Sequence, residues 1–142
     1  MLPPFFSDSH DTARLALRPA VAAELPAAPE ATVGDFLHRT LRPVLKLQNP
    51  LLLFTVADFL REHHVPFAQA SATEQQRLAA ELLTRNVKLR YTIIGLMTGL
   101  FTGPETSFYR RHRGEVNRRL LELATQRVQD QVAAVAAATA EE

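Results

Sequence analysis

The stretch from Leu89 to Gly103, LRYTIIGLMTGLFTG, constrains the fold more than any other part of this chain. It carries no charge between Tyr91 and Pro104, and its apolar residues fill two adjoining stripes of a helix. The uncharged run is shorter than the roughly 20 residues that a membrane-spanning helix needs, and basic residues bracket it closely. It therefore predicts a soluble, buried helix at the centre of a small helical domain.

Two glycines inside this stretch, Gly95 and Gly99, are four residues apart and share one face of the predicted helix. A glycine inside a helix costs about 1 kcal/mol relative to alanine, and close approach of a second helix is the expected offset. The Gly-x-x-x-Gly face is therefore predicted to pack against the apolar helix expected over residues 51–63. Thr102 and Pro104 then mark the start of a further helix.

Helical spacing of apolar residues recurs through most of the remaining chain, and strand-like alternation does not persist. Helices are expected over residues 33–48 with a kink or break at Pro43, over 51–63 and 72–84, and from Pro104 to about 137. The last of these would form a rod of roughly 50 Å, whose distal half should project or pack against another chain. The predicted fold is all-α: a small bundle of four to five helices with a long C-terminal helix.

Proline separates the beginning of the chain from this domain. Residues 1–31 hold five of the nine prolines and an alanine-rich run, which predicts a flexible leader without a continuous helix. Within it Leu2, Phe5 and Phe6 are candidates for docking on the domain or on a partner. Residues 32–137 are expected to form one domain with one core, and 138–142 a frayed tail.

The charges are spread unevenly around a net charge of +1. Residues 1–35 hold two cations and five anions, whereas 85–119 hold eight cations and two anions, so an anionic partner belongs on the second segment. The absence of cysteine excludes disulfides, thiol chemistry and cysteine zinc sites. The start MLPPFFSDSH lacks the pattern of a signal peptide, which predicts a cytoplasmic protein.

Residue patterns typical of catalysis do not stand out in the sequence. There is no HExxH, no glycine-rich phosphate loop and no GxSxG. His112 and Glu115 have the reverse order of the Glu-x-x-His pair of di-iron bundles, and the carboxylates Asp58 and Glu62 lack a predicted cleft. We therefore predict no catalytic residue, metal or cofactor.

One concentration of charge is pronounced, on the C-terminal helix. It consists of Arg110, Arg111, Arg113, Arg118 and Arg119. Arginine pairs bidentately with phosphate, so the cluster is a candidate contact for nucleic acid or for an acidic protein. The same side chains also fit a solvated helix surface that pairs with neighbouring glutamates, because they spread around the helix.

Several motifs between residues 33 and 132 resemble a family of short, all-helical bacterial proteins of unassigned role, often labelled glyoxalase. They are LRPVLKLQN (41–49), GLMTGLFT (95–102), Tyr109 and the helix from NRRL to RVQDQ (117–131). The label implies a metal-dependent lyase with His and Glu ligands, which the helical pattern does not match, so no ligand is carried over. Pro50 and the leader depart from the family pattern, whose motif singles out a polar recognition stripe: Arg42, Lys46, Gln48 and Asn49.

Three functions follow from the sequence as hypotheses. The first is a non-enzymatic helical binding or scaffold protein that self-associates as a homo-oligomer through its C-terminal helix. The second is a nucleic-acid-associated protein that uses the arginines of segment 85–119. The third is a glyoxalase-type lyase, which rests on the family label alone.

Overall fold

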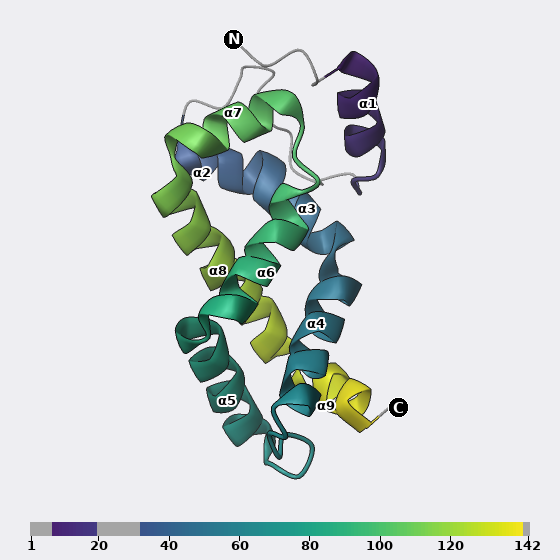
Figure 1. Cartoon of the computed structure of the whole chain (residues 1–142), viewed down its shortest axis with the longest axis vertical. Helices are drawn as coiled ribbons and strands as arrows, with labels where there is room; N and C mark the ends of the chain where they lie inside the picture. The colour runs from purple at the N-terminus through teal and green to yellow at the C-terminus, as the bar shows by residue number, and fades with distance from the viewer. Residues whose placement is uncertain (1–6, 20–31, 141–142) are drawn as a thin grey trace. The chain divides into compact units, whose positions relative to one another are not determined.

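The computed structural model describes residues 7–19 and 32–140, and most of these residues are helical (Figure 1). No strand occurs in this part of the chain, which confirms the all-α prediction. Within the same residues, no helix has both the length and the apolarity needed to cross a membrane. The helices are α1 (Asp8–Ala16), α2 (Val33–Phe36), the π-helical turn η1 (Leu37–Leu41), α3 (Arg42–Leu47), α4 (Asn49–Glu62), α5 (Ala72–Arg85), α6 (Val87–Thr98), α7 (Gly103–Arg111), α8 (Arg113–Asp130) and α9 (Val132–Ala140).

The helix α1 lies inside the segment predicted to be a leader without a continuous helix, so that prediction is wrong for residues 8–16. No proline lies between Pro4 and Pro19, so these residues can form a helix. Ser7 caps it by accepting a hydrogen bond from the His10 amide. The docking candidates Leu2, Phe5 and Phe6 lie outside the described residues.

The helices form two compact units, where the sequence predicted a single core. Unit 1 comprises Met1–Gln48 and Met97–Leu120, and unit 2 comprises Asn49–Leu96 and Leu121–Glu142. Each unit therefore combines two segments that are distant in the sequence, and each has its own set of buried apolar side chains.

The core of unit 1 is built around Phe36, which is completely buried. Its ring stacks on Phe108 with centroids 4.8 Å apart and meets Phe101 edge-on at 5.4 Å. Both arrangements are ones that aromatic pairs prefer. Phe36 thereby joins the helix of residues 33–47 to the segment around α7.

Of the two alternatives predicted at Pro43, a kink or a break, the break does not occur in the helix over residues 33–47. The π-helical turn η1 precedes the proline, and the Arg42 amide donates to the Leu37 carbonyl five residues back. This wider turn suits a residue that lacks a backbone donor and whose ring would crowd the carbonyl four residues back. The chain remains helical from Val33 to Leu47.

The C-terminal region is not the single long helix that the sequence predicted. It is divided at His112, whose φ of −126° and ψ of 28° are not helical, and again at Gln131. The last segment, α9, packs against α4 and α5 of unit 2 and buries Val132 and Val135. The distal apolar residues Val132 and Val135, expected to project or to pack against another chain, are therefore buried in a helix that packs within its own unit.

The helix α6 is not buried on all sides, and its glycines do not lie at a close helix contact. It buries a stripe that includes Leu89, Ile93 and Met97, but Tyr91 is 66% exposed. Gly95 is exposed, and a Cβ added there would meet nothing within 4 Å. Gly99 is also exposed and follows the last residue of α6. The close-packing prediction for Gly95 is therefore wrong, and the exposure of Gly99 does not fit it.

Candidate functional site

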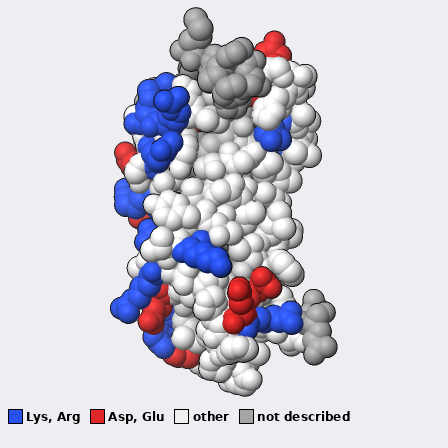
Figure 2. Space-filling view, in the orientation of Figure 1, with Lys and Arg blue, Asp and Glu red and all other residues white. Residues whose placement is uncertain are grey.

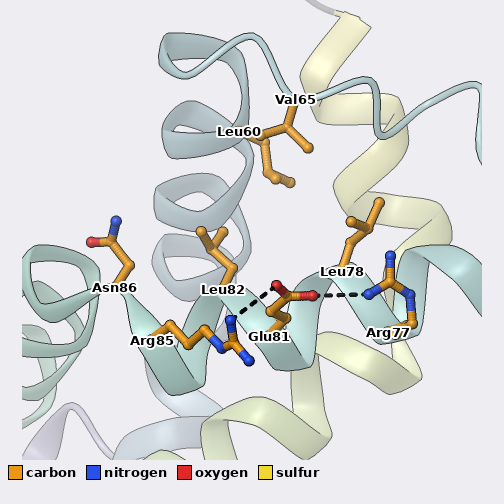
Figure 3. Close-up of a pocket in the computed structure, with 8 residues that line it drawn as sticks. All are labelled: Leu60, Val65, Arg77, Leu78, Glu81, Leu82, Arg85 and Asn86. Atoms are coloured by element: carbon orange, nitrogen blue, oxygen red, sulfur yellow. Dashed lines mark hydrogen bonds and ion pairs between the residues drawn. The ribbon is translucent and has the colours of Figure 1, made fainter.

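Unit 2 contains a pocket of about 470 Å³ at the end of α4 and along α5, which we call the α4–α5 pocket (Figure 3). Leu60 and Val65 point into it from α4 and the residues that follow, and Leu78 and Leu82 face them from α5. Polar side chains complete the lining: Arg77, Glu81, Arg85 and Asn86. The pocket thus combines apolar walls with charged groups along one helix, as small-molecule sites do.

The turn after α4 places Val65 beside Leu60. His64 adopts a left-handed conformation with φ of 54°, and the Val65 amide then donates to the Leu60 carbonyl at 3.0 Å. The buried Gln75 of α5 donates its side-chain amide to the Phe67 carbonyl at 3.0 Å. Since both contacts tie the connecting segment to its helices, the apolar wall is held in place by hydrogen bonds.

The two arginines of the pocket differ in how strongly they are paired. Arg77 donates to Glu81 at 2.9 Å and contacts both carboxylate oxygens of Glu74. The hydrogen bond from Arg77 lowers the pKa of Glu74, and Glu74 in turn raises the pKa of Arg77. Arg85 approaches Glu81 only to 3.7 Å and is 79% exposed. Within the described residues its guanidinium makes no hydrogen bond.

Asn86 separates α5 from α6 and lines the same pocket. Its Oδ1 accepts a hydrogen bond from the Leu89 amide at 2.9 Å, which caps the first turn of α6. The side-chain Nδ2 has no protein acceptor in the described part of the chain. The lining therefore offers two sets of polar hydrogens, on Arg85 and on Asn86.

A second opening in unit 2, of about 510 Å³, shares Leu60 and Val65 with the first. It lies between the segment after α4 and the end of α9, and its lining includes His64 and Thr139. The apolar pair Leu60 and Val65 therefore lines two neighbouring cavities.

The predicted arginine cluster is only partly gathered. Arg110, Arg111 and Arg113 are exposed where α7 meets α8, and Figure 2 shows basic side chains grouped over this corner. Arg111 lies 5.9 Å from the centre of the Phe108 ring and Arg113 lies 5.4 Å from that of Tyr109. The remaining two predicted residues lie further along α8: Arg118 is exposed and has an interaction partner, and Arg119 is half-buried.

The predicted recognition stripe does not form a single free surface. Arg42 and Lys46 are exposed on α3, and the half-buried Gln48 already has an interaction partner. Asn49 begins α4 in unit 2, where it exchanges two hydrogen bonds of 2.9 Å with the side-chain amide of Gln131. Because Asn49 holds this internal contact, it is not available to a ligand.

Sequence reasoning missed a buried charge cluster in unit 1. Arg18 places two guanidinium nitrogens 2.5 and 2.6 Å from the Glu105 carboxylate, and the side chains are only 7% and 9% exposed. The same carboxylate accepts hydrogen bonds from the Thr40 hydroxyl and the Thr102 amide, both at 2.9 Å. Asp11 of α1 accepts from the Gly103 amide at 2.8 Å. The capping motif at Thr102 and Glu105 was visible in the sequence, but nothing there pointed to Arg18.

Burial favours the neutral form of Glu105, but the hydrogen bonds from Arg18, Thr102 and Thr40 outweigh it and lower the pKa of this carboxyl. The charged oxygens are fully engaged by protein donors, so the cluster is built to hold structure. It ties α1 to the start of α7.

Within the described residues, no three side chains of His, Asp or Glu lie together as a metal-binding group would require. Comparison with protein-family models, with curated proteins and with solved structures finds no match to this chain. The structure therefore describes an all-α protein of two compact units, with a pocket in unit 2 that has both apolar and charged lining residues.

Proposed function

We propose that this chain is a non-enzymatic helical binding protein and that the α4–α5 pocket is its ligand-contact site. The observation that carries the proposal is the pairing of four apolar side chains with charged groups on α5 in a cavity of about 470 Å³. Cavities of this size and character are typical of small-molecule sites. Arg77 is paired with Glu74 and Glu81 beside the pocket, and the half-buried Val65, Leu78 and Leu82 leave part of the apolar wall accessible.

The test is a titration with 1-octanol, a neutral apolar probe, followed by amide chemical shifts in two-dimensional NMR. We expect shifts confined to the residues that line the pocket. Leu78→Glu places a carboxylate on the apolar wall and should abolish them, whereas Thr73→Glu adds the same charge to an exposed first-turn position of α5 and should not. Shifts spread evenly over both units, or equal binding by the two variants, would refute the proposal.

A second candidate function is association with nucleic acid, which the exposed Arg110, Arg111 and Arg113 favour. Their guanidinium groups are suited to phosphate, and two of them lie over aromatic rings. The triple replacement by glutamine should remove binding to a single-stranded oligonucleotide at low salt. Binding of the unaltered chain that does not weaken as salt rises would argue against this function.

The remaining predictions have less support. Self-association through the C-terminal helix stays a prediction, but α9 already uses its apolar residues against α4 and α5. The cytoplasmic location also stays a prediction. For the lyase alternative, elemental analysis of the purified protein for a bound divalent metal is the direct test.

A further inference from the structure

We infer that the ligand of the α4–α5 pocket is a free aliphatic carboxylate of medium chain length, with its carboxylate at Arg85 and Asn86. The inference rests on the proposed function and adds the chemistry of the ligand. It follows from the distribution of hydrogen-bond donors around the pocket and from the apolar walls beside them (Figure 3).

The charge of the lining favours an anion. Two guanidinium groups and one carboxylate line the pocket, and Glu81 is neutralised by its 2.9 Å contact with Arg77. Arg77 is committed to Glu74 and Glu81, whereas Arg85 has only the 3.7 Å approach to Glu81. Arg85 therefore supplies the available positive charge, in a fork geometry that matches a carboxylate.

Asn86 adds a second donor next to that charge. Its Oδ1 is used in capping α6, which fixes the side chain and leaves Nδ2 to donate. Asn86 lines the same pocket, and a carboxylate bound at Arg85 would replace the 3.7 Å contact of its guanidinium with Glu81 (Figure 3).

The apolar walls indicate the chemistry of the part of the ligand beyond its carboxylate. Leu60, Val65, Leu78 and Leu82 present only methyl and methylene groups to the cavity, so they favour an alkyl chain over a polar body. The volume of about 470 Å³ lies in the range of small-molecule sites, which favours a free acid. Affinity should rise about fourfold with each methylene that the walls cover.

The experiment is a calorimetric titration of the full chain with butanoate, hexanoate and octanoate, and with 1-octanol and octylammonium as probes with the same tail. We expect affinity to increase along the acid series and octanoate to bind at least threefold more tightly than octanol. Arg85→Gln should weaken octanoate about threefold to tenfold and leave octanol unchanged. Lys88→Gln removes the same charge from an exposed neighbour outside the pocket and should change neither.

The outcomes separate this inference from the proposed function. If octanol and octylammonium bind in the pocket as well as octanoate does, the pocket binds ligands but the carboxylate assignment is wrong. The assignment is also wrong if Arg85→Gln and Lys88→Gln weaken octanoate equally, because the effect would then be one of overall charge. If none of the probes binds, both the inference and the proposed function are refuted.

Discussion

Removing the Glu105 carboxylate is predicted to be the most destabilising single change to a charged side chain in unit 1. Four hydrogen bonds end on this carboxylate: two from Arg18 and one each from Thr40 and Thr102. Glu105→Ala leaves the Arg18 guanidinium in a site where its side chain is 7% exposed. It also leaves the Thr40 hydroxyl, in a residue with no exposed surface, without this acceptor.

The structure sets the size of the effect. Breaking a buried ion pair by deleting one partner costs about 3 to 5 kcal/mol, because the other charge stays buried without compensation. No residue of α1 is buried, so α1 and Arg18 can move into solvent and relieve part of that cost. We therefore expect a loss of about 3 kcal/mol, near the lower limit. For a chain of 142 residues this corresponds to a fall in Tm of roughly 6 to 12 °C.

Urea unfolding followed by circular dichroism measures this loss, and Glu115→Ala is the matched control. Glu115 is an exposed glutamate of α8, and its replacement should change stability by less than about 0.5 kcal/mol. A double-mutant cycle with Arg18→Met isolates the pair, for which we expect a coupling of at least about 2 kcal/mol. A loss below about 1 kcal/mol in Glu105→Ala, or a coupling near zero, would show that Arg18 and Glu105 are not paired as described.

Four further predictions follow from individual contacts. Because the pKa of Glu105 is lowered in the folded chain, its charge contributes stability above the unfolded-state pKa of about 4.3. This stability is lost as pH falls through the lower pKa of the folded chain. Urea unfolding of Glu105→Gln at different pH values should lack this acid-dependent loss. Gly95→Ala should stabilise the chain by about 0.5 to 1 kcal/mol, since the new Cβ meets no atom; a lower Tm would reveal a close contact at this face. Asn49→Ala should lower the free energy of unfolding by about 1 to 2 kcal/mol, because the paired amide contact with Gln131 is lost. Adding Gln131→Ala in the same background should lower it little further. Truncation after Gln131 should lower the Tm without lowering the mass measured by light scattering; a drop in mass at unchanged stability would restore the oligomerisation prediction.

Local signals in the sequence predicted local structure well. Thr102 starts α7 as expected, and Ser71 caps α5 in the same way, because a side chain that bonds an amide three residues ahead needs no distant partner. The Glu74 side chain pairs with Arg77 and does not complete a capping box with Ser71. Helical spacing likewise placed α4 and the helix around Pro43 within a few residues.

Tertiary contacts could not be predicted from the sequence in the same way. The contact between Arg18 and Glu105 joins residues 87 positions apart, and neither carries a sequence mark of the other. The division at Gln131 interrupts a continuous apolar stripe, and the helix beyond it buries Val132 and Val135 and packs on α4 and α5 inside unit 2. Gly95 and Gly99 resembled a packing motif, but both residues are exposed. Periodicity shows which residues share a face, and it does not show what covers that face.

The same distinction applies to the candidate site. Whether an arginine can bind a ligand depends more on the protein acceptors that already engage its guanidinium than on its neighbours in the sequence. Arg18 is buried with three hydrogen bonds, and Arg77 is shared between two carboxylates. Arg85 is exposed, makes no hydrogen bond in the described part of the chain, and lies beside an apolar cavity. Clustering in the sequence pointed instead to residues 110–119, where charge is dense. The α4–α5 pocket therefore combines apolar side chains that a ligand could cover with a guanidinium that, among the described residues, makes no hydrogen bond.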